Sequence, residues 1–297
     1  MDESKIIEKS AEHAFLYMLD RIRQDPTGWF GIRIAFSRKL KHENIVTSLT
    51  NIENELQKVA KRSHDACKYI CEHVGSISPA NLYKFRDGDV VLLATVSLEK
   101  DLKDIKALHQ NLQERFGTEL CEFHSLVKDI YSYQRLSDNK LLSCKRISAY
   151  EKMADRSMVK SIPLRRSKRD DPLIIFVEDD KFTSTHACNI LNKEFDVIPA
   201  KTGEEAILYY IEHAPDMVFL DIHLPGLTGC ETLKAIKKVD ARAHVVMLSV
   251  DTVKKNILET SHSGAAGFIK KPFSKSRLIN TASKSPFIKI EGNRTHS

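Results

Sequence analysis

FLDIHLPGLTG, from Phe219 to Gly229, places one aspartate at the end of an apolar run and directly before a loop that contains proline and glycine. Short, continuous apolar runs are typical of strands that are buried on both faces of a parallel sheet. The chain after residue 172 contains five such runs, and an amphipathic stretch follows each of them. In order, the runs are LIIFV, FDVIPA, DMVFLD, HVVMLS and GFIKK. This alternation predicts five βα units.

Five βα units favour an α/β domain with an open, doubly wound parallel sheet that carries helices on both faces. In such sheets, ligands and chemistry gather beyond the carboxyl ends of the strands. Polar or charged residues stand at four of these ends. They are Glu178 and Asp179 after the first strand, Asp221 after the third, Ser249 after the fourth and Lys271 after the fifth.

Three carboxylates at one edge of a sheet repel one another unless a cation lies among them, and oxygen ligands favour a hard ion such as Mg²⁺. A carboxylate next to bound Mg²⁺ is able to attack a phosphoryl group and form an aspartyl phosphate. Asp221 is the candidate nucleophile because an accessible loop follows it. Lys271 and Ser249 are placed to hydrogen-bond the new phosphoryl oxygens.

The acidic pair in FVEDD, the aspartate in LDIHLPGLTG, the hydroxyl residue in VVMLS and the segment GAAGFIKKPF resemble the receiver domain of two-component response regulators in order and spacing. The resemblance covers residues 172–285 and implies a flavodoxin-like sheet. It implies that a histidine kinase or phosphotransfer protein is the phosphodonor. The residue roles that it implies are Mg²⁺ binding by Glu178, Asp179 and Asp221, phosphate acceptance by Asp221, phosphate contact by Ser249 and Lys271, and a switch aromatic at Phe268.

For two of these roles, the sequence offers adjacent residues of the same type. We take Glu178 with Asp179 as the acidic pair, so that Asp180 opens the first helix and interacts with its N-terminal dipole. We take Lys271 over Lys270 because Lys271 directly precedes Pro272, where the family lysine stands before a bond that is typically cis. Phosphorylation would then shift the equilibrium between two preexisting conformations of the domain. The favoured conformation would have a remodelled face made by the fourth helix, the fifth strand and the fifth helix.

The first half of the chain predicts an α+β domain. WFGIRIAF reads as a strand, residues 44–74 as a long helix, NLYKF and VVLLATVS as a hairpin around an Asp-Gly turn, and residues 102–117 as a second helix. The order β-α-β-β-α suggests a ferredoxin-like fold, in which the βαβ unit is split. We expect a further helix within residues 118–136, whose Phe123, Leu126, Ile130 and Tyr133 would form a core or a dimer face.

The segment YKFRDGDVVLL is faintly similar to the hairpin of diguanylate cyclase (GGDEF-like) domains. Arg86 and Asp87 stand where that family has paired glycines, and the strand IRIAF offers no carboxylate for a metal. The resemblance therefore implies a degenerate, noncatalytic domain. A receiver-controlled nucleotide cyclase-type enzyme is the alternative.

The length and composition of the chain limit its number of domains, its binding partners and its location. The 297 residues predict two domains, which we place at 1–156 and 172–290 with a basic linker at 157–171. The net charge of +6 is spread along the chain, so we expect the linker arginines to be solvated, and nucleic-acid binding is the less favoured alternative. No export signal or apolar span of roughly 18 residues is visible, so we expect a cytoplasmic protein without membrane insertion.

The 6 cysteines are expected to be reduced. His64, Cys67, Cys71 and His73 offer soft zinc ligands, but their spacing favours a helix with buried thiols. The function that the sequence predicts is a response regulator, a signalling switch and not a turnover enzyme. Its N-terminal domain would serve output or docking, through a homodimer or a downstream protein partner.

Overall fold

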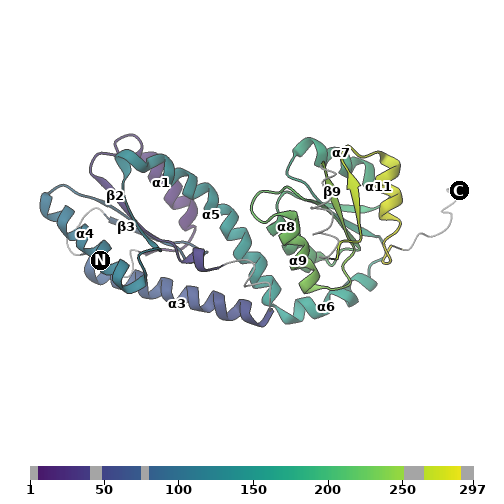
Figure 1. Ribbon diagram of the computed structural model, residues 1–297, viewed down its shortest axis with the longest axis horizontal. Coiled ribbons are helices and arrows are strands. Elements are labelled where there is room, and N and C mark those ends of the chain that lie inside the picture. Colours follow the sequence, from purple (N-terminus) through teal and green to yellow (C-terminus); the bar gives the residue numbers. More distant parts are fainter. Residues whose placement is uncertain (1–5, 41–48, 75–79, 251–263, 289–297) are drawn as a thin grey trace. The chain divides into compact units, whose positions relative to one another are not determined.

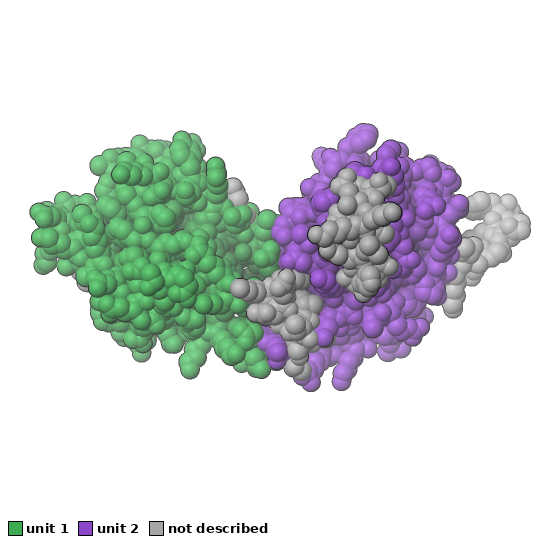
Figure 2. Space-filling view, in the orientation of Figure 1, with its two compact units in different colours: residues 1–45, 53–147 green, residues 46–52, 148–297 purple. Residues whose placement is uncertain are grey.

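The computed structural model describes residues 6–40, 49–74, 80–250 and 264–288 (Figure 1). The chain divides into two compact units, which Figure 2 colours separately. Unit 1 contains residues 1–45 and 53–147, and unit 2 contains residues 46–52 and 148–297. Among the described residues, no helix combines the length and the apolar content that crossing a bilayer requires.

Unit 2 contains a five-stranded parallel sheet in the order β10-β9-β8-β6-β7. The strands are β6 (Leu173–Val177), β7 (Asp196–Ala200), β8 (Met217–Asp221), β9 (Val245–Ser249) and β10 (Gly267–Lys270). The helices between and after them are α7 (Lys181–Leu191), α8 (Gly203–His213), α9 (Gly229–Val239) and α11 (Lys275–Ala282). This arrangement confirms the predicted flavodoxin-like sheet. The helix expected after β9 lies outside the described residues.

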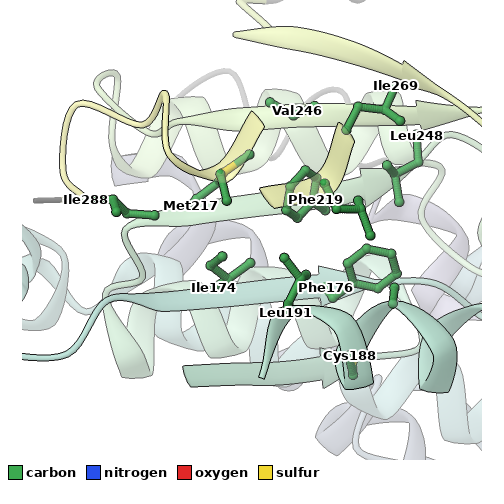
Figure 3. Close-up of a cluster of buried hydrophobic side chains, with 13 residues drawn as sticks. Ile174, Phe176, Cys188, Leu191, Met217, Phe219, Val246, Leu248, Ile269 and Ile288 are labelled. Atoms are coloured by element: carbon green, nitrogen blue, oxygen red, sulfur yellow. The ribbon is translucent and has the colours of Figure 1, made fainter. Parts of the chain in front are cut away.

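The core of unit 2 explains why its strands are continuously apolar. Every residue of β6, β8 and β9 is buried, because helices cover both faces of the sheet. Figure 3 shows one side of this core, where Phe176 and Phe219 lie on neighbouring strands and Leu191 of α7 packs over them. The three central strands are therefore held rigidly, and so are the residues at their ends.

The described helices of unit 2 that begin at the carboxyl edge of the sheet start with a side-chain cap. Asp180, Thr202 and Thr228 each accept a hydrogen bond from a backbone N–H of the first turn of α7, α8 and α9. Such caps satisfy helix donors that otherwise lack a partner. Asp180 thus opens the helix that follows the first strand of this sheet, as the sequence predicts. The caps fix where each loop at this edge ends.

Unit 1 contains a mixed sheet in the order β1-β3-β4-β2-β5. Its strands are β1 (Ile6–Ile7), β2 (Trp29–Ile34), β3 (Ala80–Lys84), β4 (Val90–Thr95) and β5 (Cys121–Ser125). Its helices are α1 (Ala11–Ile22), the short 3-10 helix η2 (Phe36–Lys39), α3 (Leu49–His73), α4 (Glu99–Phe116) and most of α5 (Leu126–Ala154). The predicted β-α-β-β-α order is present as β2-α3-β3-β4-α4.

One expectation for unit 1 is wrong in part. Residues 121–125 were expected within a helix, but they form β5, which pairs antiparallel with β2. The helix α5 begins only at Leu126. Leu126, Ile130 and Tyr133 belong to the buried core that α5 forms with α1 and the sheet, and Phe123 lies on β5 with its ring stacked on Phe30.

The basic segment that was expected to be a solvated linker is the helix α6 (Arg156–Ser167), which lies in unit 2 and packs on α8. Two arginines at the end of this helix, and Arg169 after it, donate hydrogen bonds to carbonyl oxygens at and just after the end of α8. The pairs are Arg165 with Ile211 and Glu212, Arg166 with Pro215, and Arg169 with His213 and Ala214. The expectation of solvated arginines is therefore wrong. The carbonyl oxygens in the last turn of a helix have no partner within the helix, and these arginine side chains donate hydrogen bonds to them.

Arg166 is the most buried of these arginines. Its guanidinium contacts the Asp240 carboxylate at 2.8 Å and the Tyr210 hydroxyl at 2.7 Å. The side chains of Arg166 and Asp240 are 5% and 8% exposed. Burial alone would raise the pKa of Asp240, but the hydrogen bonds from Arg166 and Tyr210 hold it below its ordinary value.

We expect Arg166→Ala to lower the free energy of unfolding of unit 2 by about 3 kcal/mol, because it leaves the Asp240 carboxylate buried without its cation. Hydrogen exchange of the β6 and β8 amides under urea measures unit 2, while fluorescence of the single tryptophan, Trp29, follows unit 1. Lys168→Ala is the matched control, because Lys168 is exposed and should change stability by less than about 0.5 kcal/mol. Equal effects of the two variants would contradict the expectation.

Candidate functional site

Four neighbouring strands of unit 2 bring the predicted site residues to one edge. Asp221 is the last residue of β8 and Ser249 the last residue of β9, while Glu178 and Lys271 directly follow β6 and β10. Glu178, Asp221 and Ser249 are buried, and Asp179 is exposed. A parallel sheet places all its carboxyl ends on one side, so residues distant in sequence converge here.

The Lys271 ammonium lies between two buried carboxylates. Its Nζ forms an ion pair with Asp221 Oδ2 at 2.9 Å and a second one with Glu178 Oε2. The backbone N–H of Lys271 donates to the carbonyl oxygen of Ser249 at 2.8 Å, which ties the residue to the end of β9. The Lys271–Pro272 bond is cis. Lys270, in contrast, is exposed, so Lys271 is the lysine that reaches the carboxylates.

The pKa shifts follow from this geometry. Burial raises the pKa of Glu178, the hydrogen bond from Lys271 opposes that shift, and the neighbouring Asp221 charge adds to it. Burial lowers the pKa of Lys271, but its hydrogen bonds to Glu178 and Asp221 outweigh this effect, so its pKa lies above the ordinary value. Lys271 therefore stays a cation at neutral pH and offsets the repulsion between the two carboxylates.

Asp221 is held tightly by the backbone around it. Its Oδ1 accepts the N–H of Ile222 at 2.8 Å, and the N–H of Gly229 donates to the Ile222 carbonyl at 2.9 Å. A Cβ on Gly229 would overlap the carbonyl oxygen of Asp221, so only glycine lets α9 begin this close to the strand. The other carboxylate oxygen of Asp221, Oδ2, faces the Lys271 ammonium.

The acidic side chains fit a hard divalent cation. One carboxylate oxygen from each of Glu178, Asp179 and Asp221 lies within 4.8 Å of the others, and no other group of three potential ligands occurs in the described part of the chain. An all-oxygen set of this size and charge suits Mg²⁺. His64, Cys67, Cys71 and His73, for which a helix with buried thiols was favoured over a zinc site, do not form such a group. Burial raises the pKa of the Cys67 thiol to about 12.

Phe268, the predicted switch aromatic, lies on β10 opposite Met247 of β9 and is half-buried. It therefore lies on the strand next to Ser249, two residues before Lys270, which pairs with Ser249 at the site edge. Residues 251–263, which follow Ser249 and Val250, lie outside the described part of the chain. The expected fourth helix and part of the face that phosphorylation was expected to remodel fall there.

Unit 1 has its own buried charge cluster at the β3–β4 hairpin, where the cyclase-like resemblance was noted. Lys140 of α5 forms ion pairs with Asp87 Oδ2 at 2.6 Å and with Asp89, and Arg33 of β2 contacts Asp89 at 3.0 Å. Burial would raise the pKa of Asp89, but Lys140 and Arg33 hold it below its ordinary value. Burial and the Asp89 charge raise the pKa of Asp87. A lysine ammonium thus occupies the space between the hairpin carboxylates.

Sequence reasoning missed Lys140 because it lies 51 positions from Asp89 on a different element. It also missed Gly229 as a constrained position. The signal for Gly229 is its place just after the cap residue Thr228, eight residues beyond a strand-end aspartate.

Part of the chain is similar to known proteins. Residues 174–283 match the family model described as the response regulator receiver domain. The chain is 35% identical to the chemotaxis protein CheY of Bacillus subtilis over 113 residues, which are 37% of this chain and 94% of that protein. It is 33% identical to CheY of Halobacterium salinarum over 111 residues, 37% of this chain and 92% of the relative.

Solved structures with a similar fold include the receiver domain of NtrX from Brucella abortus, with 33% identity, a TM-score of 0.36, and coverage of 38% of this chain and 96% of that one. Proteins with receiver domains act in two-component signalling, typically bind Mg²⁺ at an acidic site and receive phosphate from a donor such as a histidine kinase. Because the chain spans nearly the whole length of relatives more than 30% identical to it, it belongs through residues 174–283 to the response regulator receiver family.

Proposed function

We propose that Asp221 accepts a phosphoryl group from a phosphohistidine of a histidine kinase or phosphotransfer protein. The observation that carries this proposal is the pairing of the Asp221 carboxylate with the Lys271 ammonium, beside Glu178 and Asp179, at the carboxyl edge of the sheet. Asp221 is only 5% exposed, and its Oδ2 is the oxygen that faces the cation. This oxygen is the nucleophile.

In the transfer, Oδ2 of Asp221 forms a bond to phosphorus while the phosphorus–nitrogen bond of the donor breaks. The leaving imidazole nitrogen keeps the electron pair and takes up a proton. Lys271 hydrogen-bonds a phosphoryl oxygen, for which it gives up part of its contact with Glu178. Mg²⁺, when held by Glu178, Asp179 and Asp221, supplies positive charge that offsets the repulsion between the carboxylate and the phosphoryl group.

The new phosphate then adds negative charge next to the end of β9. We propose that the Ser249 hydroxyl donates a hydrogen bond to it and that Phe268 changes its rotamer in response, so that the population of receiver conformations shifts. The N-terminal unit is the noncatalytic target of that shift. The hairpin carboxylates of this unit favour this view over a nucleotide enzyme, because both already form ion pairs with Lys140.

Acetyl phosphate with Mg²⁺ should add the mass of one phosphoryl group to the wild-type chain and none to Asp221→Asn, because the amide is no longer a nucleophile. Intact-mass spectrometry measures the adduct. Asp179→Asn is a useful comparison, since it keeps the nucleophile and should label more slowly and need more Mg²⁺. Label that survives in Asp221→Asn would contradict the proposed acceptor.

Lys271→Ala should slow labelling of Asp221 by about 100-fold, which is the usual effect of removing a donor to a developing oxyanion. It should also tighten Mg²⁺ binding, measured by calorimetry, because the competing ammonium is gone from between the carboxylates. Lys270→Ala is the matched control: that lysine is exposed on the adjacent position. Equal rates in the two variants would show that Lys271 has no part in the transfer.

Lys140→Ala should destabilise unit 1 by about 3 kcal/mol or more, because two buried carboxylates lose their shared cation. Trp29 fluorescence during urea unfolding follows this unit. Lys128→Ala on the same helix, at an exposed position, serves as the control. The receiver should still be phosphorylated at the wild-type rate in both variants, and a loss of labelling in Lys140→Ala would contradict a purely structural Lys140.

A further inference from the structure

Glu204 is a fully buried acidic residue of unit 2 that the proposed phosphoryl transfer does not use. It is the second residue of α8 and is 0% exposed. Its Oε1 accepts the backbone N–H of Leu227 at 3.1 Å. Leu227 belongs to the loop of residues 222–228, which connects Asp221 to α9. Glu204 therefore joins one helix to the loop that carries the phosphoacceptor.

The Glu204 carboxylate also packs against the turn of that loop. Gly226 has φ +81°, a left-handed conformation that favours glycine. A Cβ on Gly226 would lie 2.7 Å from each carboxylate oxygen of Glu204. The carboxylate thus fills the space that a side chain at position 226 would need, and the turn cannot move toward α8.

The start of α8 is itself a fixed support. Thr202 caps it by accepting the N–H of Glu205 at 3.2 Å. A Cβ on Gly203 would lie 2.7 Å from the Leu227 carbonyl oxygen and would overlap the Thr232 hydroxyl of α9. Helices α8 and α9 also lie side by side (Figure 1). The start of α8 is thus fixed by its cap and by its close contact with α9. The position of Glu204 therefore sets the conformation of the 222–228 loop, and not the reverse.

Both ends of the loop act on Asp221. The N–H of Ile222 donates to Asp221 Oδ1, and Gly229 at the far end packs on the Asp221 backbone. We propose that Glu204 is a positioning residue that fixes the 222–228 loop and, through it, the orientation of the Asp221 carboxylate. This inference rests on the proposed phosphorylation of Asp221. It assigns part of the rate of that reaction to a residue that never touches the phosphate.

A simpler role for Glu204 would be interaction with the dipole of α8, since acidic residues in the first turn stabilise a helix. Glu205 is the matched control for that role. It stands in the same turn, but its carboxylate accepts the N–H of Lys201 at 2.7 Å and not that of Leu227. A dipole effect would make the two positions equivalent, whereas a loop clamp makes only Glu204 matter.

The test compares the full-length wild type with Glu204→Ala, Glu204→Gln and Glu205→Gln. Acetyl phosphate labelling is followed by intact mass, so that the rate constant and the final labelled fraction are obtained separately, across a series of Mg²⁺ concentrations. Hydrogen exchange at the Leu227 amide reports the clamp without any phosphorylation. Thermal unfolding of each variant gives its stability.

We expect Glu204→Ala to lower the rate constant about tenfold, a fraction of the roughly 100-fold that a 1 Å misplacement can cost. Exchange of the Leu227 amide should accelerate, and the Mg²⁺ concentration for half-maximal rate should rise. Glu204→Gln keeps an acceptor of the same volume, so it should restore most of the rate. Glu205→Gln should match the wild type.

Three results would overturn the inference. A wild-type rate constant in Glu204→Ala would do so, as would a fall only in thermal stability and labelled fraction, which is what a merely structural residue causes. Equal slowing in Glu205→Gln would favour the helix dipole. If the wild type itself takes no label, the proposed function fails, and the Leu227 exchange still decides whether Glu204 holds the loop.

Discussion

The interaction on which the receiver site depends is the contact of one buried ammonium, that of Lys271, with the carboxylates of Glu178 and Asp221. Carboxylates that are withdrawn from water this far need a nearby cation to stay charged. The lysine supplies that charge from within the chain, and it leaves the acidic edge ready for a second cation. The sheet makes the contact possible, because three parallel strands hold these groups at fixed spacing.

In the N-terminal unit, too, a buried lysine pairs with two buried carboxylates, but there it leaves neither of them ready for a second cation. There Lys140 pairs with Asp87 and Asp89, and Arg33 pairs with Asp89, so both hairpin aspartates have a cation from the protein itself. Asp179 is exposed in the receiver, whereas both hairpin aspartates are buried. A site that is able to exchange its counter-ion suits signalling chemistry, and a site that is closed by its own lysine suits a structural role.

The sheet of the receiver unit could be predicted from sequence because each of its buried strands is a short apolar run that ends on a polar residue or directly before one. Residues at those ends, such as Asp221 and Ser249, converge for a reason that the fold class already contains. Local pattern could not reveal Glu204, Arg166 or Lys140, because each contacts a partner 23 or more positions away. The strand Cys121–Ser125 was hidden because it runs directly into the helical pattern of α5.

Gly229 has a consequence for how variants of this protein would be classified. It carries no functional group, yet any side chain there would overlap the carbonyl oxygen of Asp221 and push the phosphoacceptor strand or α9 out of place. In a genetic screen for signalling defects, substitutions at Gly229 would therefore group with those of Asp221 itself. The set of positions at which substitution would disturb the site is therefore larger than the set of residues that take part in its chemistry. It includes a position that contributes only because it has no side chain.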